Sequence, residues 1–271
     1  MTSTGDQWRI RPGGGLDLAA IDTREPSGAP GDKDATVEAT AVLNARLGEL
    51  QERLYAEGSR SLLVVLQAMD AGGKDGTVKH VFSGVNPAGV GVTSFKVPSE
   101  EELAHDFLWR IHAEVPARGH IGVFNRSHYE DVLVVRVDEI VPEAVWRPRY
   151  DAIWAFEHHL ATEGTAIVKI FLHISKEEQA ERFQARLDDE TKHWKFNRGD
   201  LAVRERWDDY RAAYSEAIAR TTTDEAPWFV VPADRKWYRN WAVSTILVEA
   251  LEALDPQYPV QGEDLSDVTV I

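Results

Sequence analysis

The chain has 271 residues, of which 43% are hydrophobic and 28% charged, a composition typical of a soluble globular protein with enough apolar material for a core. Its 45 acidic and 30 basic residues leave a net charge of −15, which disfavours generic binding to nucleic acid or to an anionic membrane. An anionic substrate would therefore have to meet locally concentrated basic groups. The chain has no Cys, which excludes disulfides, thiolate nucleophiles, Fe–S clusters and Cys-ligated zinc.

The N-terminal region has no signal for secretion, and no apolar run approaches the roughly 20 residues that cross a bilayer, so we expect a cytoplasmic protein. Residues 1–33 carry two clusters of Gly and Pro without a sustained hydrophobic period, which favours an N-terminal arm on the surface. Beyond residue 34, Leu residues recur at helical spacing as far as Gly58, which is a suitable C-cap. This pattern predicts an amphipathic helix.

Short apolar segments alternate with helical patterns along the rest of the chain. The predicted strands are 62–66, 90–96, 121–125, 166–174 and 228–232. The predicted helices between and after them include 105–115, 150–163, 176–188 and 237–254. The alternation predicts an α/β fold, a three-layer sandwich around a mostly parallel central sheet. We expect one domain over residues 34–254 and an acidic C-terminal tail over 255–271.

A glycine-rich loop, AMDAGGKDG at 68–76, follows the first predicted strand and leads into a helix. This order supplies inward-facing backbone N–H groups, a helix N-terminus and Lys74, which can reach a terminal phosphoryl group. The match to the Walker A pattern GxxxxGK(S/T) is imperfect, because Ala68 stands at the first Gly position and Asp75 at the Ser/Thr position. The predicted phosphate-binding residues of the loop are Ala71, Gly72, Gly73, Asp75, Gly76 and Thr77.

Asp70 lies inside this loop, where its negative charge would repel a phosphate unless it binds a metal ion or a substrate hydroxyl. It is therefore a candidate Mg²⁺ ligand. The ordinary alternative is an Asx-turn that only shapes the loop.

The loop is similar to the GxDxxGKxG loop of the family-2 polyphosphate kinases, and the similarity continues in order along the chain. The further blocks that resemble this family are 107–112, 119–131, 192–196, 207–210 and 228–236. The resemblance implies a P-loop kinase of the thymidylate-kinase-like kind, with a helical lid near residues 190–203. It also implies Mg²⁺-dependent, reversible transfer of the terminal phosphoryl group of inorganic polyphosphate to AMP or ADP. The arm and the aromatic content predict a homo-oligomer (dimer or tetramer), and the resemblance favours the tetramer.

The family's second motif usually begins with Asp in an Asp-Arg-Ser triplet, where this chain has Asn125. Because Asn is a neutral and weaker Mg²⁺ ligand, we expect the carboxylate to come from Glu130 or Asp131. The form Asn-Arg-Ser-His-Tyr-Glu-Asp-Val resembles the subgroup credited with phosphorylating both AMP and ADP. The predicted catalytic residues are Asp70, Lys74, Arg126, Glu130 and Asp131, with Asp70 and Asp131 as metal ligands.

Phosphoryl transfer requires in-line positioning and positive charge on the migrating group, which Lys74, Arg126 and Mg²⁺ would supply. The alternative for Arg126 is a surface salt bridge. Residues 182–211 hold eight Lys or Arg against seven acidic residues, in a chain of net charge −15. Three cations of this segment lie among aromatic residues and a Gly. For these three, we favour a role in a lid that closes over phosphates, rather than charge pairing along a helix. These predicted lid cations are Lys192, Lys195 and Arg198.

Lys79, His80 and Lys96 are candidate residues of a channel for the polymer, although a solvated face explains each of them equally well. The nine His residues include no HExxH motif, so we predict structural or surface roles for them. Two other functions stay open from the residues alone. One is an ATP-dependent nucleoside monophosphate kinase on the same fold, and the other is a non-catalytic nucleotide-binding regulator.

Overall fold

The computed structural model describes residues 3–260 and residue 262, and it contains one five-stranded sheet. The strand order is β2-β3-β1-β4-β5, and every neighbouring pair is parallel. The strands are β1 (Ser61–Ala68), β2 (Val90–Ser94), β3 (Ile121–Asn125), β4 (Thr165–His173) and β5 (Trp228–Pro232). All five predicted strands are present, and the sequence prediction of a parallel sheet is confirmed.

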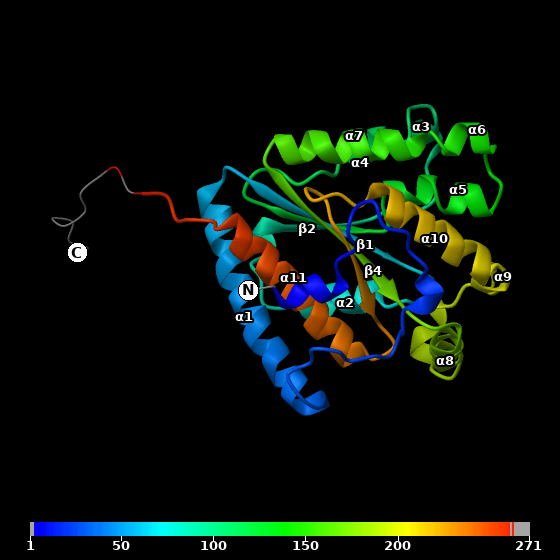
Figure 1. Ribbon diagram of the computed structural model, residues 1–271, viewed down its shortest axis with the longest axis horizontal. Coiled ribbons are helices and arrows are strands. Elements are labelled where there is room, and N and C mark those ends of the chain that lie inside the picture. The colour runs from blue at the N-terminus through cyan, green and yellow to red at the C-terminus, as the bar shows by residue number, and fades with distance from the viewer. Residues whose placement is uncertain (1–2, 261, 263–271) are drawn as a thin grey trace.

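Helices cover both faces of the sheet and make it the middle of three layers (Figure 1). One face carries α1 (Lys33–Glu57), α2 (Lys74–Val81) and α11 (Lys236–Leu254). The other carries α5 (Val134–Val137), α6 (Glu143–Trp146), α7 (Arg149–Thr162) and α10 (Trp207–Thr221). Beyond the carboxyl ends of the strands lie α8 (Lys176–Leu187) and α9 (Gly199–Glu205). The short turns are η1 (Thr4–Trp8), η2 (Leu18–Ala20), η3 (Pro87–Gly89), η4 (His128–Asp131) and η5 (Glu190–Lys195).

The predicted helix over 105–115 was wrong in its extent. Within that range the structure has a single helical turn, α4 (Trp109–His112), and another, α3 (Glu100–Leu103), precedes the range. Pro116 disfavours helical backbone in the residue before it and packs closely against Gly122 of β3, where an added Cβ would lie 2.8 Å from its ring. The chain therefore leaves the helix early and enters the strand.

The core surrounds β1, all of whose residues are buried because both neighbouring strands and both helical layers cover them. In the predicted N-terminal arm over 1–33, Trp8 and Leu18 are buried in the core of the same chain. The Trp8 indole donates to the Tyr238 hydroxyl over 3.1 Å, and Arg9 forms an antiparallel bridge with Phe229 of β5. Most of the predicted tail over 255–271 lies outside the described residues.

Among the helices of the described chain, none combines the length and hydropathy needed to cross a membrane. The carboxyl ends of β1 and β3 meet at one edge of the sheet, since Leu66 pairs with Asn125. In parallel α/β sheets this edge is where ligands bind.

Candidate active site

A cleft of about 1040 Å³ opens at this edge. Residues 70–76 of the glycine-rich loop form its floor, and Asn125 and Arg126 enter it from the end of β3. Ser94, Phe95 and Lys96 contribute from the end of β2, while α8, α11 and the segment around residues 192–200 form the opposite wall. The tertiary structure thus brings the predicted phosphate loop, the second motif and the predicted lid to one place.

The loop has the backbone geometry of an anion cradle. Ala71 has φ +59° and Gly73 has φ +101°, so the chain turns sharply before α2 begins at Lys74. Gly73 is the N-cap of α2 and carries no side chain to accept the first-turn N–H groups, which leaves them available to an anion. A side chain at Gly73 would also collide with Arg239, whose Nη1 lies 2.2 Å from the position of an added Cβ.

Lys74 lies between the loop and the second motif, and its Nζ donates to the Ala68 carbonyl over 2.9 Å. Burial is the main cause that lowers the pKa of Lys74 to about 8, and the charge of Arg126 lowers it further. The bound phosphate oxygens of a substrate would reverse this effect, because they restore negative charge beside the ammonium group.

Arg126 joins the two predicted motifs. Its Nη2 lies 2.6 Å from Asp70 Oδ1 in the loop, and its Nη1 lies 3.7 Å from Glu130 Oε2. Its backbone has φ +63° and its N–H donates to the Leu66 carbonyl, which fixes the residue immediately after β3. Burial raises the pKa of Glu130. The predicted set of Asp70, Lys74, Arg126 and Glu130 is therefore one contiguous group.

Asn125 donates through Nδ2 to Asp75 Oδ1 over 2.7 Å. A carboxylate at position 125 would stand against the carboxylate of Asp75 and would need a proton or a cation between them. The neutral amide removes that requirement, and it explains how Asp75 is accommodated at the Ser/Thr position of the loop.

Asp131 lies apart from this group. Its Oδ1 is 3.0 Å from Arg149 Nη1 and its Oδ2 is 4.0 Å from Arg110 Nη2, while burial raises its pKa. Among the described residues, neither Asp131 nor Glu130 lines the cleft directly, so their contacts decide between them. Of the two carboxylates predicted to replace the missing Asp, Glu130 is the one that contacts Arg126, so the geometry gives no support to metal ligation by Asp131.

The predicted lid places Lys192 and Lys195 in the cleft wall, together with Trp194, whose side chain is 78% exposed. Asp200 of α9 also faces the cleft, and burial followed by the charge of Asp70 raises its pKa. Arg198, Lys79 and Thr77 fall outside the described lining; the Thr77 hydroxyl donates to the Gly73 carbonyl over 3.1 Å. Of the three candidate channel residues, His80 and Lys96 line the cleft.

Sequence reasoning missed four cations of the wall as site residues, namely Arg182, Arg186, Lys236 and Arg239. Arg182 donates to the Ala71 carbonyl over 3.0 Å and so ties α8 to the phosphate loop. Arg239 is 2% exposed, and burial lowers its pKa to about 10. Arg182 and Arg186 belong to the basic segment already noted, whereas Arg239 lacked a signal because its place beside Gly73 depends on how α11 packs.

A parallel sheet with a phosphate loop after its central strand, and a cation-lined cleft at its carboxyl edge, define a phosphotransferase of the P-loop kinase class. The sequence model of the family described as Polyphosphate kinase 2 (PPK2) matches residues 31–259. This chain belongs to that family, and it is a polyphosphate kinase.

Two relatives and one solved structure are similar to this chain over most of their length. The AMP/ADP-polyphosphate phosphotransferase of Meiothermus ruber is 58% identical over 265 residues, which cover 98% of this chain and 99% of that protein. The ADP-polyphosphate phosphotransferase of Rhodopseudomonas palustris is 49% identical over 79% of this chain and 78% of that protein. The crystal structure of Polyphosphate Kinase 2 from Arthrobacter aurescens superposes with a TM-score of 0.93 at 49% identity, covering 97% of this chain and 94% of that one.

Proposed function

We propose that this enzyme transfers the terminal phosphoryl group of inorganic polyphosphate to both AMP and ADP, giving ADP and ATP. The observation that carries the proposal is the wall opposite the phosphate loop, where a chain of net charge −15 gathers six cations against the three carboxylates Glu178, Glu181 and Asp200. The cations are Arg182, Arg186, Lys192, Lys195, Lys236 and Arg239. A long polyanion is the substrate that needs so many separated cations, because each phosphate unit of the polymer carries its own negative charge. Reversal is expected, since both the broken and the formed bonds are phosphoanhydrides.

The residues of the floor would orient the reacting groups. Lys74 and the N–H groups at the start of α2 would hold the oxygens of the migrating phosphoryl group, and Arg126 would neutralise its equatorial oxygens from the side of β3. Asp70 and Glu130 hold Arg126 in place through the contacts of 2.6 and 3.7 Å. Charge and position are the main requirements of this reaction, and no covalent intermediate with the protein is needed.

Asp70 is the carboxylate that we propose for a Mg²⁺ ion. Within residues 3–260 and 262, no group of three His, Cys, Asp or Glu side chains is arranged to hold a metal. The single carboxylate of Asp70 still fits Mg²⁺, because this ion commonly binds one or two carboxylates and completes its coordination shell with water and substrate phosphates. When bound, the ion would supply positive charge to the phosphate oxygens.

We further propose that the segment 190–203 closes over the substrates as a lid. Its exposed Lys192, Trp194 and Lys195 already face the cleft, so a small movement would bring two cations onto the polymer and exclude water.

We also propose that the enzyme is a cytoplasmic homo-oligomer, either a dimer or a tetramer. The exposure of Trp109 (41%) and Trp154 (49%) supports an interface between copies. Light scattering on a sizing column tests the subunit number.

The decisive experiment is a donor and acceptor matrix with the purified chain and Mg²⁺. Polyphosphate is offered with AMP alone or with ADP alone, and ATP is offered with AMP in a third reaction, with the products separated by ion exchange. Phosphorylation of both acceptors from polyphosphate is expected. Turnover from ATP with none from polyphosphate would select the ATP-dependent monophosphate kinase. Nucleotide binding without turnover from either donor would select the regulator.

A further inference from the structure

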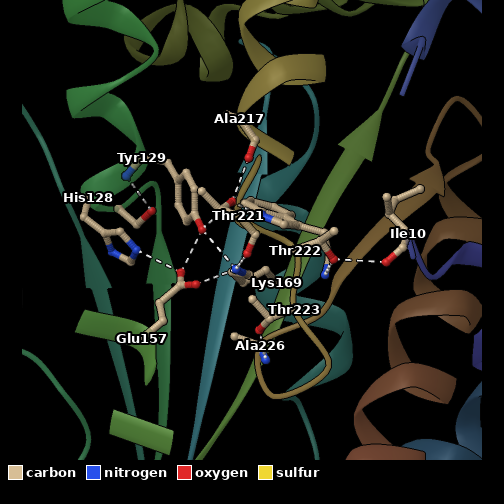
Figure 2. Close-up of polar contacts among 12 residues, drawn as sticks. Ile10, His128, Tyr129, Glu157, Lys169, Ala217, Thr221, Thr222, Thr223 and Ala226 are labelled. Carbon is tan, nitrogen blue, oxygen red and sulfur yellow. Dashed lines mark hydrogen bonds and ion pairs between the residues drawn. The ribbon is translucent and has the colours of Figure 1, made fainter. Parts of the chain in front are cut away.

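A second group of charged side chains lies outside the cleft, inside the layer between the sheet and the helices α7 and α10 (Figure 2). We call it the buried cluster and define it as His128, Tyr129, Glu157, Lys169 and Thr221. These five residues are between 0% and 2% exposed. Burying an ion costs several kcal/mol unless a partner and hydrogen bonds compensate, so such a group calls for a reason.

Lys169 lies in the middle of β4, where it pairs with Val65 of β1 and Trp228 of β5. Its ammonium group has three donors and uses each of them. They go to Glu157 Oε2, to the Tyr129 hydroxyl over 3.0 Å and to the Thr221 carbonyl over 2.7 Å. Burial lowers the pKa of Lys169, while the charge of Glu157 opposes that effect.

The other oxygen of Glu157 is bonded to the turn η4. Glu157 Oε1 accepts from the Tyr129 hydroxyl over 2.8 Å and lies 3.2 Å from His128 Nε2. His128 Nδ1 has no hydrogen-bond partner among the described residues, so His128 joins the cluster through Nε2 alone. At the centre of the cluster, the ammonium group of Lys169 is paired with the carboxylate of Glu157.

The groups that the ion pair holds belong to two functional elements. His128 and Tyr129 belong to η4 together with Glu130, and Arg126 of the cleft stands two residues before this turn, so a movement of η4 displaces Glu130 and the contact that Glu130 makes with Arg126. Thr221 is the last residue of α10, the helix that follows α9 of the proposed lid. On the same helix, the Tyr214 hydroxyl donates to the Ala68 carbonyl over 3.2 Å, at the start of the phosphate loop.

We propose that the buried Lys169–Glu157 pair is a positioning unit for phosphoryl transfer, which fixes the turn that follows Arg126 and carries Glu130 against the helix that follows the lid. Stability alone does not account for the pair, because replacing a buried ion pair by apolar residues of similar volume is often neutral or stabilising. Directional bonds to η4 and α10 supply what apolar contacts lack, a defined angle between the two elements. The inference rests on the proposed function.

The test is the double variant Lys169→Met/Glu157→Leu, which removes both charges at once and leaves neither unpaired. We expect it to fold, with kcat for polyphosphate and ADP reduced roughly 10- to 100-fold and KM for both substrates within about threefold, since small misplacement of catalytic groups has effects of this size. Lys169→Met/Glu157→Gln keeps an acceptor for His128 and Tyr129, and it should recover part of the lost kcat. The matched control is Ile153→Ala, one turn earlier on α7 and fully buried, which should lower the melting temperature without lowering kcat.

Hydrogen exchange supplies a readout that does not depend on turnover. In the apolar double variant, the amides of residues 126–131 and of the last turn of α10 should exchange faster than in the wild type, while those of α1 should not change. Wild-type exchange in both segments together with wild-type kcat would overturn the proposal. The proposal would also be overturned if the apolar double variant and Ile153→Ala lost the same melting temperature and showed the same change in kcat. A wild-type enzyme inactive on polyphosphate would refute the proposed function, while the exchange comparison would still decide the positioning role.

Discussion

The cleft and the buried cluster are two charged regions built on opposite principles. In the cleft, the six cations of the wall outnumber its three carboxylates, and Arg239 is 2% exposed with its pKa lowered to about 10. In the buried cluster, Lys169 and Glu157 satisfy each other and every donor of the ammonium group. The cations that would bind a charged substrate are thus not fully neutralised by the protein. The charges of Lys169 and Glu157, which hold a position, neutralise each other.

The largest effect is expected at the floor of the cleft. Lys74→Ala should lower kcat about 100- to 1000-fold and leave the melting temperature nearly unchanged, because the lost ammonium group meets the migrating phosphoryl group. Steady-state turnover of ADP with polyphosphate measures it, with Lys33→Ala at the exposed start of α1 as the matched control. Near-normal turnover in the Lys74 variant would contradict the assignment of this residue.

Glu130 lies where the two regions meet, since it shares its turn with His128 and Tyr129 and contacts Arg126 in the cleft. Glu130→Gln should lower kcat roughly 10- to 100-fold, because Arg126 loses one of the two carboxylates that orient it. Asp131→Asn should stay within about threefold in kcat and should mainly lower stability, because the partners of Asp131 are Arg149 and Arg110. A larger loss of kcat in Asp131→Asn than in Glu130→Gln would identify Asp131 as the carboxylate of the site.

A smaller effect is expected from pH. The folded-state pKa of Lys74 is about 8, below its ordinary value of 10.5, so the free enzyme loses the ammonium charge as the pH rises above 8. We expect kcat/KM to fall on the alkaline side, by about tenfold at pH 9, and this limb should disappear in Lys74→Arg.

The sign of the stability effect separates this loss from unfolding. Between pH 8 and 10.5 the unfolded chain binds more protons at Lys74 than the folded chain does, so the contribution of this residue to folding stability rises with pH there. A melting temperature that fell in step with kcat/KM would attribute the alkaline loss to unfolding.

The elements most accessible from sequence were those with strong local signals. All five strands and the helix α1, with Gly58 at φ +63° as C-cap, follow from periodicity and from a residue with special backbone preferences. The helix expected over 105–115 was overestimated, because the tight packing of Pro116 on Gly122 is a tertiary contact.

By itself, the sequence determined the parallel α/β architecture, the phosphate loop and the family, since hydrophobic period, glycines and ordered motifs are local properties of the chain. Only the tertiary structure decided which charges act together. It separated Asp131 from Glu130 although they are neighbours in the sequence, and it brought Arg239 of α11 against Gly73 of the loop. It also placed Lys169 against Glu157 inside the molecule. The physical reason is that an ion's partner depends on distance and burial in three dimensions, which no local pattern specifies.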